Sequence, residues 1–340
     1  MADILNQDDF RQRLTEYLEA VLGEPVELQP PQLLISGINH ENWLLRGQIQ
    51  DQPRQFVLRR DLAADFQTPS LTHDQEFSLM QAAAAAGVRV PTPRWFCTET
   101  AILGTPFMLM DYIEGVSLGA EVVSLPELAA ARRVLPEQMG QQLARIHAIK
   151  TEQLTFLPRP GSDQSPAQAA LHHLNTALNR LEAPNPALTF ALRWAEQHLP
   201  PTGDVVLLHG DFRLGNFIVN EAGLKGIVDW EFSQIGDPCQ DLAWPCVRSW
   251  RYGDGQLPLG GFAAREPFIS AYEAASGRTI RRETVDFWEI MGNLRRAIGA
   301  LIQANRYRAS GTANVEFANL GRRSAEIQLE ALRLIAEQGV

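Results

Sequence analysis

The sequence predicts an α+β fold, with a smaller first part built around an antiparallel sheet and a larger, mainly helical second part. Three observations predict this fold. Short apolar runs bounded by Gly, Pro and Asn, which are typical of strands, gather in residues 1–112. Apolar residues at helical spacing dominate residues 113–340, and a second set of short apolar runs interrupts them between Val205 and Val228. With 340 residues, 45% of them hydrophobic, the chain is long enough for two cores, a first domain at 1–112 and a second at 113–340.

The first part is expected to begin with an amphipathic helix at residues 9–22. Strands follow at residues 32–36 and 43–49, separated by a turn that contains Gly37 and Asn39. A strand–turn–strand with a small polar tip suits a loop that covers phosphate groups, because backbone amides approach a phosphate closely where no side chain intervenes. An ordinary hairpin turn explains the same pattern.

A basic strand and a capped helix come next. Residues 55–60 form the strand, and its Arg59 is a side chain that can bind a phosphate through two N–H groups at once. Residues 72–75 have the pattern of a capping box that opens the next helix, and Glu76 lies in its first turn. We expect Glu76 to pair with Arg59. Alternatively, Arg59 is a solvent-exposed residue of an edge strand and Glu76 only stabilises the positive end of its helix.

A strongly apolar strand at residues 105–112 ends the first part, and a turn at residues 113–115 follows it. The second part has cap residues at several points where apolar residues begin to recur at helical spacing. Its glycine-rich segment 245–261 is expected to be a mobile loop that forms part of a substrate pocket. The helices are expected at residues 136–149, 166–181, 188–198, 266–276, 283–307 and 313–336.

The stretch from Val205 to Asp229 contains the residues suited to catalysis. An apolar strand ends at the turn His209-Gly210-Asp211, Asn216 opens the next strand, and a hairpin leads to Asp229. A rigid hairpin would hold these polar side chains close together. Phosphoryl transfer needs one carboxylate to orient or deprotonate the attacking hydroxyl, and a carboxamide and a second carboxylate to hold magnesium. An Asp, four residues and an Asn have the spacing of a kinase catalytic loop, although Asp211 could also be an ordinary turn residue.

The motifs HGDFRLGN, IVDWE and GDPCQDLAW resemble those of the aminoglycoside phosphotransferase family, most closely the branch whose domain is also found fused to acyl-CoA dehydrogenases. The resemblance implies a protein-kinase-like fold of two lobes. It also implies transfer of the γ-phosphoryl group of ATP to a hydroxyl of a small molecule, with Asp211 as the catalytic base and His209 supporting its loop. Asn216 and Asp229 would bind Mg²⁺.

Further residues lie where this family binds its nucleotide. The sequence departs from the family in having no Lys on the third strand and only one Gly in the phosphate loop. By the resemblance, the nucleotide site would comprise Gly37 and Asn39 in the loop, Arg59 in place of the phosphate-binding Lys with Glu76 as its partner, Met110 beside the adenine ring, and the backbone from Asp111 to Ile113 at the hinge.

The charge of residues 245–310 indicates the class of substrate. This segment contains ten Arg, no Lys and six acidic residues, a local formal charge of +4 in a chain of net charge −10. A pocket for polycationic aminoglycosides would instead be lined with carboxylates. We therefore expect an anionic hydroxylated substrate, such as a hydroxyacyl-coenzyme A or a sugar acid. Alternatively, these arginines lie on solvated helix faces and pair with carboxylates of the same segment. The candidate substrate contacts are Glu231, Arg295, Arg296 and Arg306.

The composition disfavours other classes of function. An acidic chain with a pI of about 5.3 is not expected to bind nucleic acid. Three cysteines without disulfide or zinc spacing favour reduced thiols in a cytoplasmic protein. The chain shows neither a signal peptide nor an apolar run long enough to span a membrane, so no membrane partner is expected. The alternatives are a catalytically inactive nucleotide-binding pseudokinase and a metallohydrolase that uses His209 and Asp211; the oligomeric state is not predicted.

Overall fold

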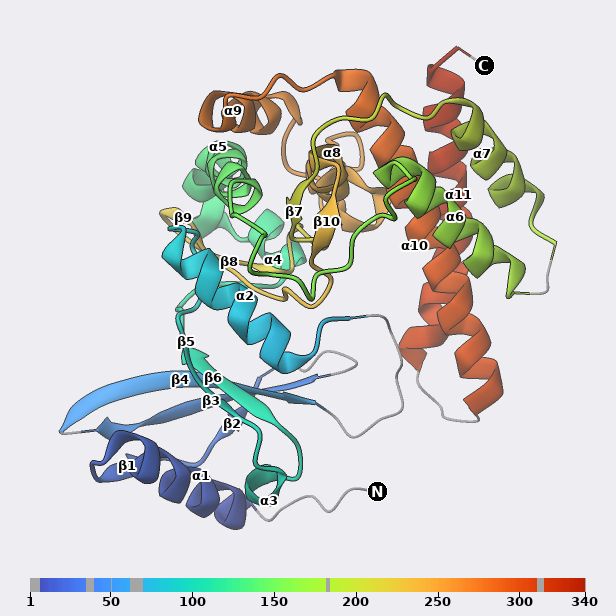
Figure 1. Ribbon diagram of the computed structural model, residues 1–340. Coiled ribbons are helices and arrows are strands. Elements are labelled where there is room, and N and C mark those ends of the chain that lie inside the picture. The colour runs from blue at the N-terminus through green and yellow to red at the C-terminus, as the bar shows by residue number, and fades with distance from the viewer. Residues whose placement is uncertain are drawn as a thin grey trace. The chain divides into compact units, whose positions relative to one another are not determined.

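Figure 1 shows a computed structural model of the chain, which describes residues 7–34, 40–49, 51–61, 70–181, 184–310 and 315–339. The chain forms two compact units. Unit 1 comprises residues 1–114 and 225–232, and unit 2 comprises residues 115–224 and 233–340. The segment that contains Asp229 therefore groups with unit 1, although residues of unit 2 flank it in the sequence.

Unit 1 is built on one antiparallel sheet, as the sequence predicts. Its strands follow the order β1-β3-β4-β6-β5, and β2 also pairs with β3. Leu14 and Leu18 of α1 are fully buried against Leu58 and Phe107 of the sheet, so the helical spacing seen in the sequence does face the core. The elements are α1 (Gln7–Leu22), β1 (Val26–Leu28), β2 (Gln32–Leu33), β3 (His40–Ile49), β4 (Gln52–Asp61), α2 (His73–Ala85), β5 (Pro93–Cys97), α3 (Thr100–Leu103) and β6 (Phe107–Asp111).

Two predictions for unit 1 need correction. Strand β2 is shorter than predicted, and β3 begins at His40 rather than at residue 43. The reason is strand pairing, because residues 40–42 extend the ladder with β4, where Asn42 lies opposite Arg59. Gly37 and Asn39 lie outside the described residues. The helix start at residue 72 is confirmed, since the Gln75 side chain accepts a hydrogen bond from the backbone N–H of Thr72 at 3.1 Å.

Unit 2 is mainly helical. Figure 1 shows α10 and α11 side by side, and α5 packs against α9. Among the described residues, two small sheets interrupt the helices: β7 pairs with β10, and β8 with β9, whose last residues belong to unit 1. The elements are α4 (Gly119–Ser124), η1 (Pro126–Leu128), α5 (Ala129–His147), α6 (Pro166–Asn179), α7 (Pro186–Gln197), β7 (Val206–Leu208), β8 (Phe217–Asn220), β9 (Gly223–Ile227), β10 (Gln234–Gly236), α8 (Pro238–Ala243), η2 (Trp244–Cys246), η3 (Arg248–Trp250), α9 (Glu266–Ser276), α10 (Arg282–Ser310) and α11 (Val315–Glu337).

The hairpin predicted before Asp229 is confirmed as β8–β9, and the bounds of α9 agree with those predicted. One prediction is wrong. Helix α5 begins at Ala129, so Pro136 lies inside the helix rather than at its start. The segment 245–261 includes the end of η2, all of η3, and Leu259, which forms a β-bridge with Ala263; its mobility stays a prediction.

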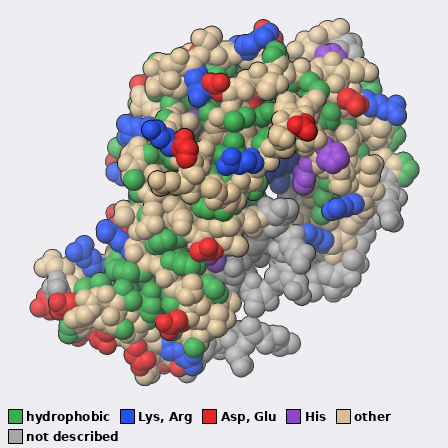
Figure 2. Space-filling model, viewed as in Figure 1, with side chains coloured by type: hydrophobic (Ala, Val, Ile, Leu, Met, Phe, Trp, Pro, Cys, Tyr) green, Lys and Arg blue, Asp and Glu red, His purple; other side chains and the backbone are tan. Residues whose placement is uncertain are grey.

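The surface carries mixed charges (Figure 2), and the thiols are buried. Figure 2 shows acidic and basic side chains interspersed on the face it displays, and the large exposed hydrophobic residues come from different elements, such as Val21, Phe190 and Leu329. No helix in the described ranges is both long and apolar enough to cross a bilayer. All three cysteines are free and buried, and burial raises the pKa of Cys239 and Cys246.

Candidate active site

Asp211 lies in the turn that follows β7, with 6% of its surface exposed. Both of its carboxylate oxygens accept hydrogen bonds. The indole Nε1 of Trp244 donates to Oδ1 at 2.6 Å, and Nδ2 of Asn216 donates to Oδ2 at 2.7 Å. The Nε of Arg213 lies 3.0 Å and 3.2 Å from the two oxygens. These donors come from both sides of the carboxylate, so its orientation is held rigidly.

Asn216 is 4% exposed and its amide nitrogen is committed to Asp211, donating to the backbone carbonyl at 2.9 Å as well as to the side chain. Its carbonyl oxygen takes no part in these two hydrogen bonds. The four residues between Asp211 and Asn216 form one tight turn, in which the N–H of Asn216 donates to the carbonyl of Arg213 at 3.1 Å. The spacing read from the sequence thus brings these two side chains together.

His209 is fully buried, as expected of a residue that supports the loop. Its Nδ1 accepts a long hydrogen bond of 3.3 Å from the N–H of Asp211. The stronger support comes from Asp241 of α8, which sequence reasoning missed although it lies in the motif GDPCQDLAW. The carboxylate of Asp241 accepts from the N–H groups of His209 at 2.6 Å and Gly210 at 3.0 Å. His147 lies 3.4 Å from the same carboxylate, and burial lowers the pKa of His147.

In unit 1, Arg59 bridges two carboxylates. Its Nε lies 3.3 Å from Oε2 of Glu76, and its Nη2 donates to Oδ1 of Asp229 at 2.8 Å. The predicted pairing of Arg59 with Glu76 is confirmed. The alternative of a solvated edge-strand arginine is wrong, because Arg59 is only 8% exposed and β4 lies between β3 and β6. Burial lowers the pKa of Arg59, but the carboxylates outweigh it and the net pKa is raised.

Glu231, a predicted substrate contact, lies beside His40 of unit 1, and the substrate contact itself stays a prediction. It is 7% exposed, and its Oε2 lies 3.2 Å from Nε2 of His40 within unit 1. Its backbone carbonyl accepts from the N–H of Leu71 at 2.7 Å. These contacts give Glu231 a structural role within unit 1.

The predicted hinge follows β6. Met110 is buried, and the side chain of Asp111 accepts two hydrogen bonds from Arg94, at 2.8 Å and 2.7 Å. The backbone N–H of Asp111 donates to Thr92, so it is already used within unit 1. Among the described residues no hydrogen bond takes the N–H of Ile113, which makes Ile113 the better candidate for a contact with adenine.

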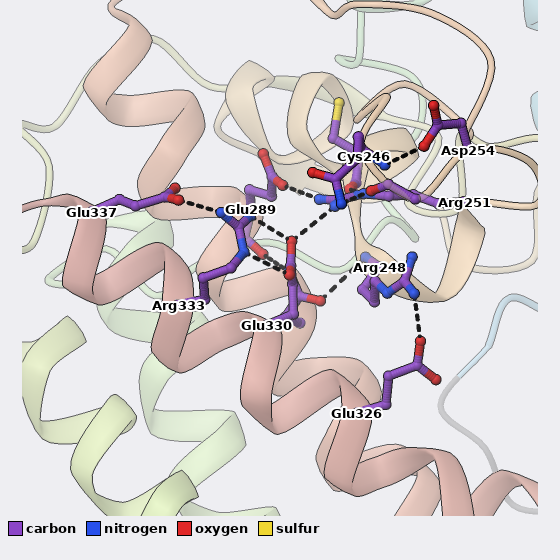
Figure 3. Close-up of polar contacts among 12 residues, drawn as sticks. Cys246, Arg248, Arg251, Asp254, Glu289, Glu326, Glu330, Arg333 and Glu337 are labelled. Atoms are coloured by element: carbon purple, nitrogen blue, oxygen red, sulfur yellow. Dashed lines mark hydrogen bonds and ion pairs between the residues drawn. The ribbon is translucent and has the colours of Figure 1, made fainter.

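Five of the ten arginines of residues 245–310 pair with carboxylates in the described part of the chain, which corrects the simple count of charges. Figure 3 shows Arg251 between Glu289 of α10 and Glu330 of α11, at 2.8 Å and 2.9 Å. Among the described residues, the arginines that form such ion pairs are Arg248, Arg251, Arg265, Arg278 and Arg282.

Two of the predicted anchors lie beside Asp211. The guanidinium of Arg295 lies 4.5 Å from the ring centre of Trp244, and its Nη1 donates to the carbonyl of Gly210 at 3.2 Å. Arg296 lies 4.6 Å from the ring centre of Trp250, and Arg213 lies 4.0 Å from the same ring. Burial lowers the pKa of Arg296 to about 10. The neighbouring arginines also lower this pKa, whereas Asp211 raises it.

The third predicted anchor, Arg306, is half-buried on α10. It makes neither a hydrogen bond nor an ion pair with any residue that the structure describes. Arg213, Trp244 and Trp250 were not identified from the sequence, although Arg213 stands within HGDFRLGN and Trp244 ends GDPCQDLAW.

Asn216 in unit 2 and Asp229 in unit 1 each carry an oxygen donor of the kind that magnesium prefers, and 25% of the Asp229 side chain is exposed. Magnesium is usually held by one or two such groups together with the phosphates of a nucleotide. Among the described residues, no group of three or more His, Cys, Asp or Glu could hold a metal ion by itself. The metallohydrolase alternative would need such a group.

Comparison with known proteins places the chain among phosphotransferases. A sequence model of the phosphotransferase enzyme family matches residues 32–282. A mouse protein named acyl-CoA dehydrogenase family member 10 is 33% identical over 238 residues, which cover 69% of this chain and 22% of that protein. The chain thus spans about a fifth of the length of this relative.

Solved structures confirm the protein-kinase-like α+β fold predicted from the sequence. A putative aminoglycoside phosphotransferase from Ralstonia eutropha superimposes with a TM-score of 0.74 at 19% identity, covering 96% of this chain and 98% of that one. A spectinomycin phosphotransferase in complex with ADP and spectinomycin superimposes with a TM-score of 0.63 at 14% identity, covering 94% and 98%.

Proposed function

The chain belongs to the phosphotransferase enzyme family, and we propose from that premise that it transfers the γ-phosphoryl group of ATP to a hydroxyl of a small molecule, with Mg²⁺. One observation carries the proposal. Asp211 and Asn216, at the spacing of a kinase catalytic loop, are joined side chain to side chain in a buried turn. The complex of a structurally similar enzyme with ADP supports a nucleotide as the phosphoryl donor.

In this proposal Asp211 orients the attacking hydroxyl and accepts its proton. Hydrogen bonds from Trp244 and Asn216 hold the carboxylate in one orientation before the acceptor arrives, so no rearrangement is needed during the reaction. Asp241 acts indirectly, because it binds the backbone N–H groups of the turn that contains Asp211. His209 supports the same turn and takes no part in proton transfer.

By the family resemblance, Asn216 and Asp229 would hold Mg²⁺, which would neutralise charge on the phosphates. Arg59 and Glu76 would belong to the phosphate end of the site, and Met110 and Ile113 to the adenine end. Gly37 and Asn39 remain candidates for the loop over the phosphates.

For the acceptor we favour an anion. Arg213, Arg295 and Arg296 converge near Asp211, and all three lie against the face of Trp244 or Trp250. Three guanidiniums near one catalytic carboxylate leave local positive charge, which suits a carboxylate or phosphate and repels a polycation. A hydroxyacyl-coenzyme A or a sugar acid fits this description.

A screen of hydroxylated metabolites for Mg²⁺-dependent ADP release tests the proposal. Each hydroxy acid is paired with its amide or methyl ester, so that only the negative charge differs. We expect release with hydroxy acids, a weaker response with their neutral partners, and rates that fall as the salt concentration rises. An aminoglycoside as the best acceptor would contradict the substrate class.

The same screen separates the enzyme from the pseudokinase alternative. The control is Asp211→Asn, which preserves the size of the side chain and removes its charge. An inactive nucleotide-binding protein would bind Mg²⁺–ATP and release ADP no faster than this variant with every acceptor.

A further inference from the structure

We propose that Arg59 acts through Asp229, and that its guanidinium positions the carboxylate that binds magnesium rather than serving mainly to hold phosphates. The inference rests on the proposed function, since it concerns the same nucleotide site. It assigns to Arg59 a task that suits the planar guanidinium better than the ammonium group of a Lys.

The first observation is the bridge itself. Arg59 extends from the interior strand β4 and is 8% exposed, and it reaches Glu76 through Nε and Asp229 through Nη2. Glu76 is 2% exposed. A guanidinium has N–H groups on more than one edge of a rigid plane, so a single side chain can engage two carboxylates in different directions. The ammonium group of a Lys is one compact charge with three rotatable donors, so it lacks the rigid plane that fixes the two carboxylates in set directions.

The second observation is the backbone at Asp229. Its φ is 70°, and Asp51 is the other non-glycine residue of the described chain with a positive φ. Such a conformation is uncommon for a residue with a side chain and persists where surrounding contacts impose it. Here contacts hold the residues on both sides of the peptide bond between Asp229 and Trp230. Arg59 holds the side chain of Asp229, and Oε1 of Glu76 accepts from the N–H of Trp230 at 3.1 Å.

Glu76 therefore serves two purposes with its two oxygens. Oε2 faces Arg59, and Oε1 holds the backbone that follows Asp229. Trp230 is fully buried, and its indole N–H donates to the carbonyl of Ile227 at 3.2 Å, so the segment cannot shift without disturbing the core. Arg59 and Glu76 together form a clamp around Asp229, and the direction in which this carboxylate points depends on the clamp.

Binding measurements can distinguish a role of Arg59 in holding phosphates from a role in positioning Asp229. A residue that holds phosphates contributes to nucleotide affinity with or without metal. A residue that positions Asp229 contributes only to the part of the affinity that magnesium adds. Substitution of Arg59 by Lys separates the two roles, because Lys binds phosphate well but lacks the planar guanidinium that holds Glu76 and Asp229 in fixed directions.

The experiment is titration calorimetry of ADP into the full chain, once with EDTA and once with MgCl₂. For Arg59→Lys we expect the gain in ADP affinity from Mg²⁺ to fall about tenfold, while the ADP affinity in EDTA changes less than about threefold. The matched control is Arg60→Lys, its neighbour on β4, which pairs with Glu41 and does not contact Asp229. The control should change neither affinity.

Other outcomes overturn the inference. Unchanged magnesium dependence in Arg59→Lys, or an equal fall in both affinities, would mean that Arg59 acts directly on phosphates or not at all. Asp229→Asn provides a second variant. Adding Arg59→Lys to it should cause no further loss of the affinity that Mg²⁺ adds. The ADP affinity of Asp229→Asn in EDTA should stay within about threefold of the wild type. A rise in that affinity would show that Asp229 had kept Arg59 from the phosphates. Failure of the unaltered protein to bind Mg²⁺–ADP would refute the proposed function instead.

Discussion

Replacing Asp241 by Asn should loosen the turn that holds the candidate catalytic base. The carboxylate of Asp241 is 1% exposed and accepts two backbone hydrogen bonds, from His209 at 2.6 Å and from Gly210 at 3.0 Å. An Asn has the same shape but only one acceptor oxygen. Its NH₂ group must therefore face one of these two N–H donors.

The cost follows from the two bonds. One hydrogen bond to a charged group is lost, worth about 1.5–3 kcal/mol, and a buried N–H is left without an acceptor at a cost of about 1–3 kcal/mol. Because the two effects overlap, we expect the free energy of unfolding to fall by about 2–5 kcal/mol. For a unit of this size that loss lowers the melting temperature by about 4–20 °C.

The assay is chemical and thermal unfolding followed by circular dichroism, with ADP release as a second measurement once an acceptor is known. The matched control is Asp254→Asn, in which the same change is made at an exposed carboxylate that accepts one backbone hydrogen bond, from Gln256 at 2.9 Å. We expect the control to cost less than about 1 kcal/mol. In Asp241→Asn, kcat should fall more than the affinity for the nucleotide, because the turn presents Asp211.

A free energy of unfolding within about 0.5 kcal/mol of the wild type would refute the reasoning, since a buried carboxylate with two short backbone bonds cannot be so dispensable. A loss no larger than that of Asp254→Asn would lead to the same conclusion.

Three further predictions follow from the site and from its surroundings. Asp211→Ala should abolish phosphoryl transfer while ADP affinity stays within about threefold, and a purified variant with near-normal turnover would rule out the role of base. Asp229→Ala should remove most of the affinity that Mg²⁺ adds to ADP binding, and equal Mg²⁺–ADP affinity in variant and wild type would count against its role as a metal ligand. Burial raises the pKa of Glu289 to about 7, against the opposing effect of Arg251 and Arg265. Because the folded state then binds this proton more tightly than the unfolded chain, the stability contributed by Glu289 is present at low pH and is lost as the pH rises through about 7. The melting temperature of the wild type minus that of Glu289→Gln should therefore decrease between about pH 5 and about pH 8, and a difference that does not vary with pH would contradict the raised pKa.

The sequence predicted the contacts of the site correctly where they join residues close together in the chain. Asp211 and Asn216 lie in one turn, and such a short stretch has few ways to arrange its side chains, so their spacing predicts their contact. The cap at Thr72 and the bounds of α9 are equally local, because caps and helical periodicity involve residues three or four positions apart.

The charge of residues 245–310 shows the limit of such reasoning. A count of ten arginines and six acidic residues sums charges without placing them. In the folded unit, Arg251 is paired with Glu289 and Glu330, and the second of these carboxylates lies outside the counted segment. Arg295 and Arg296 are instead held against tryptophans beside Asp211. Composition predicted a basic region, and packing selected the arginines that face the site.

The rest of the site depends on contacts between distant parts of the chain. Trp244 is 33 residues from Asp211, Arg295 is 85 residues from Gly210, and Glu76 is 154 residues from Trp230. By itself, the sequence determined the turn that joins Asp211 to Asn216, the start of α2, the bounds of α9 and the hairpin that precedes Asp229. Only the tertiary structure decided that Trp244 and Arg213 hold the carboxylate of Asp211, that Asp241 anchors its turn, and that Arg59 bridges to Asp229. Local spacing restricts a short segment to few conformations, whereas a contact between distant residues forms only when helices and strands pack around a common core.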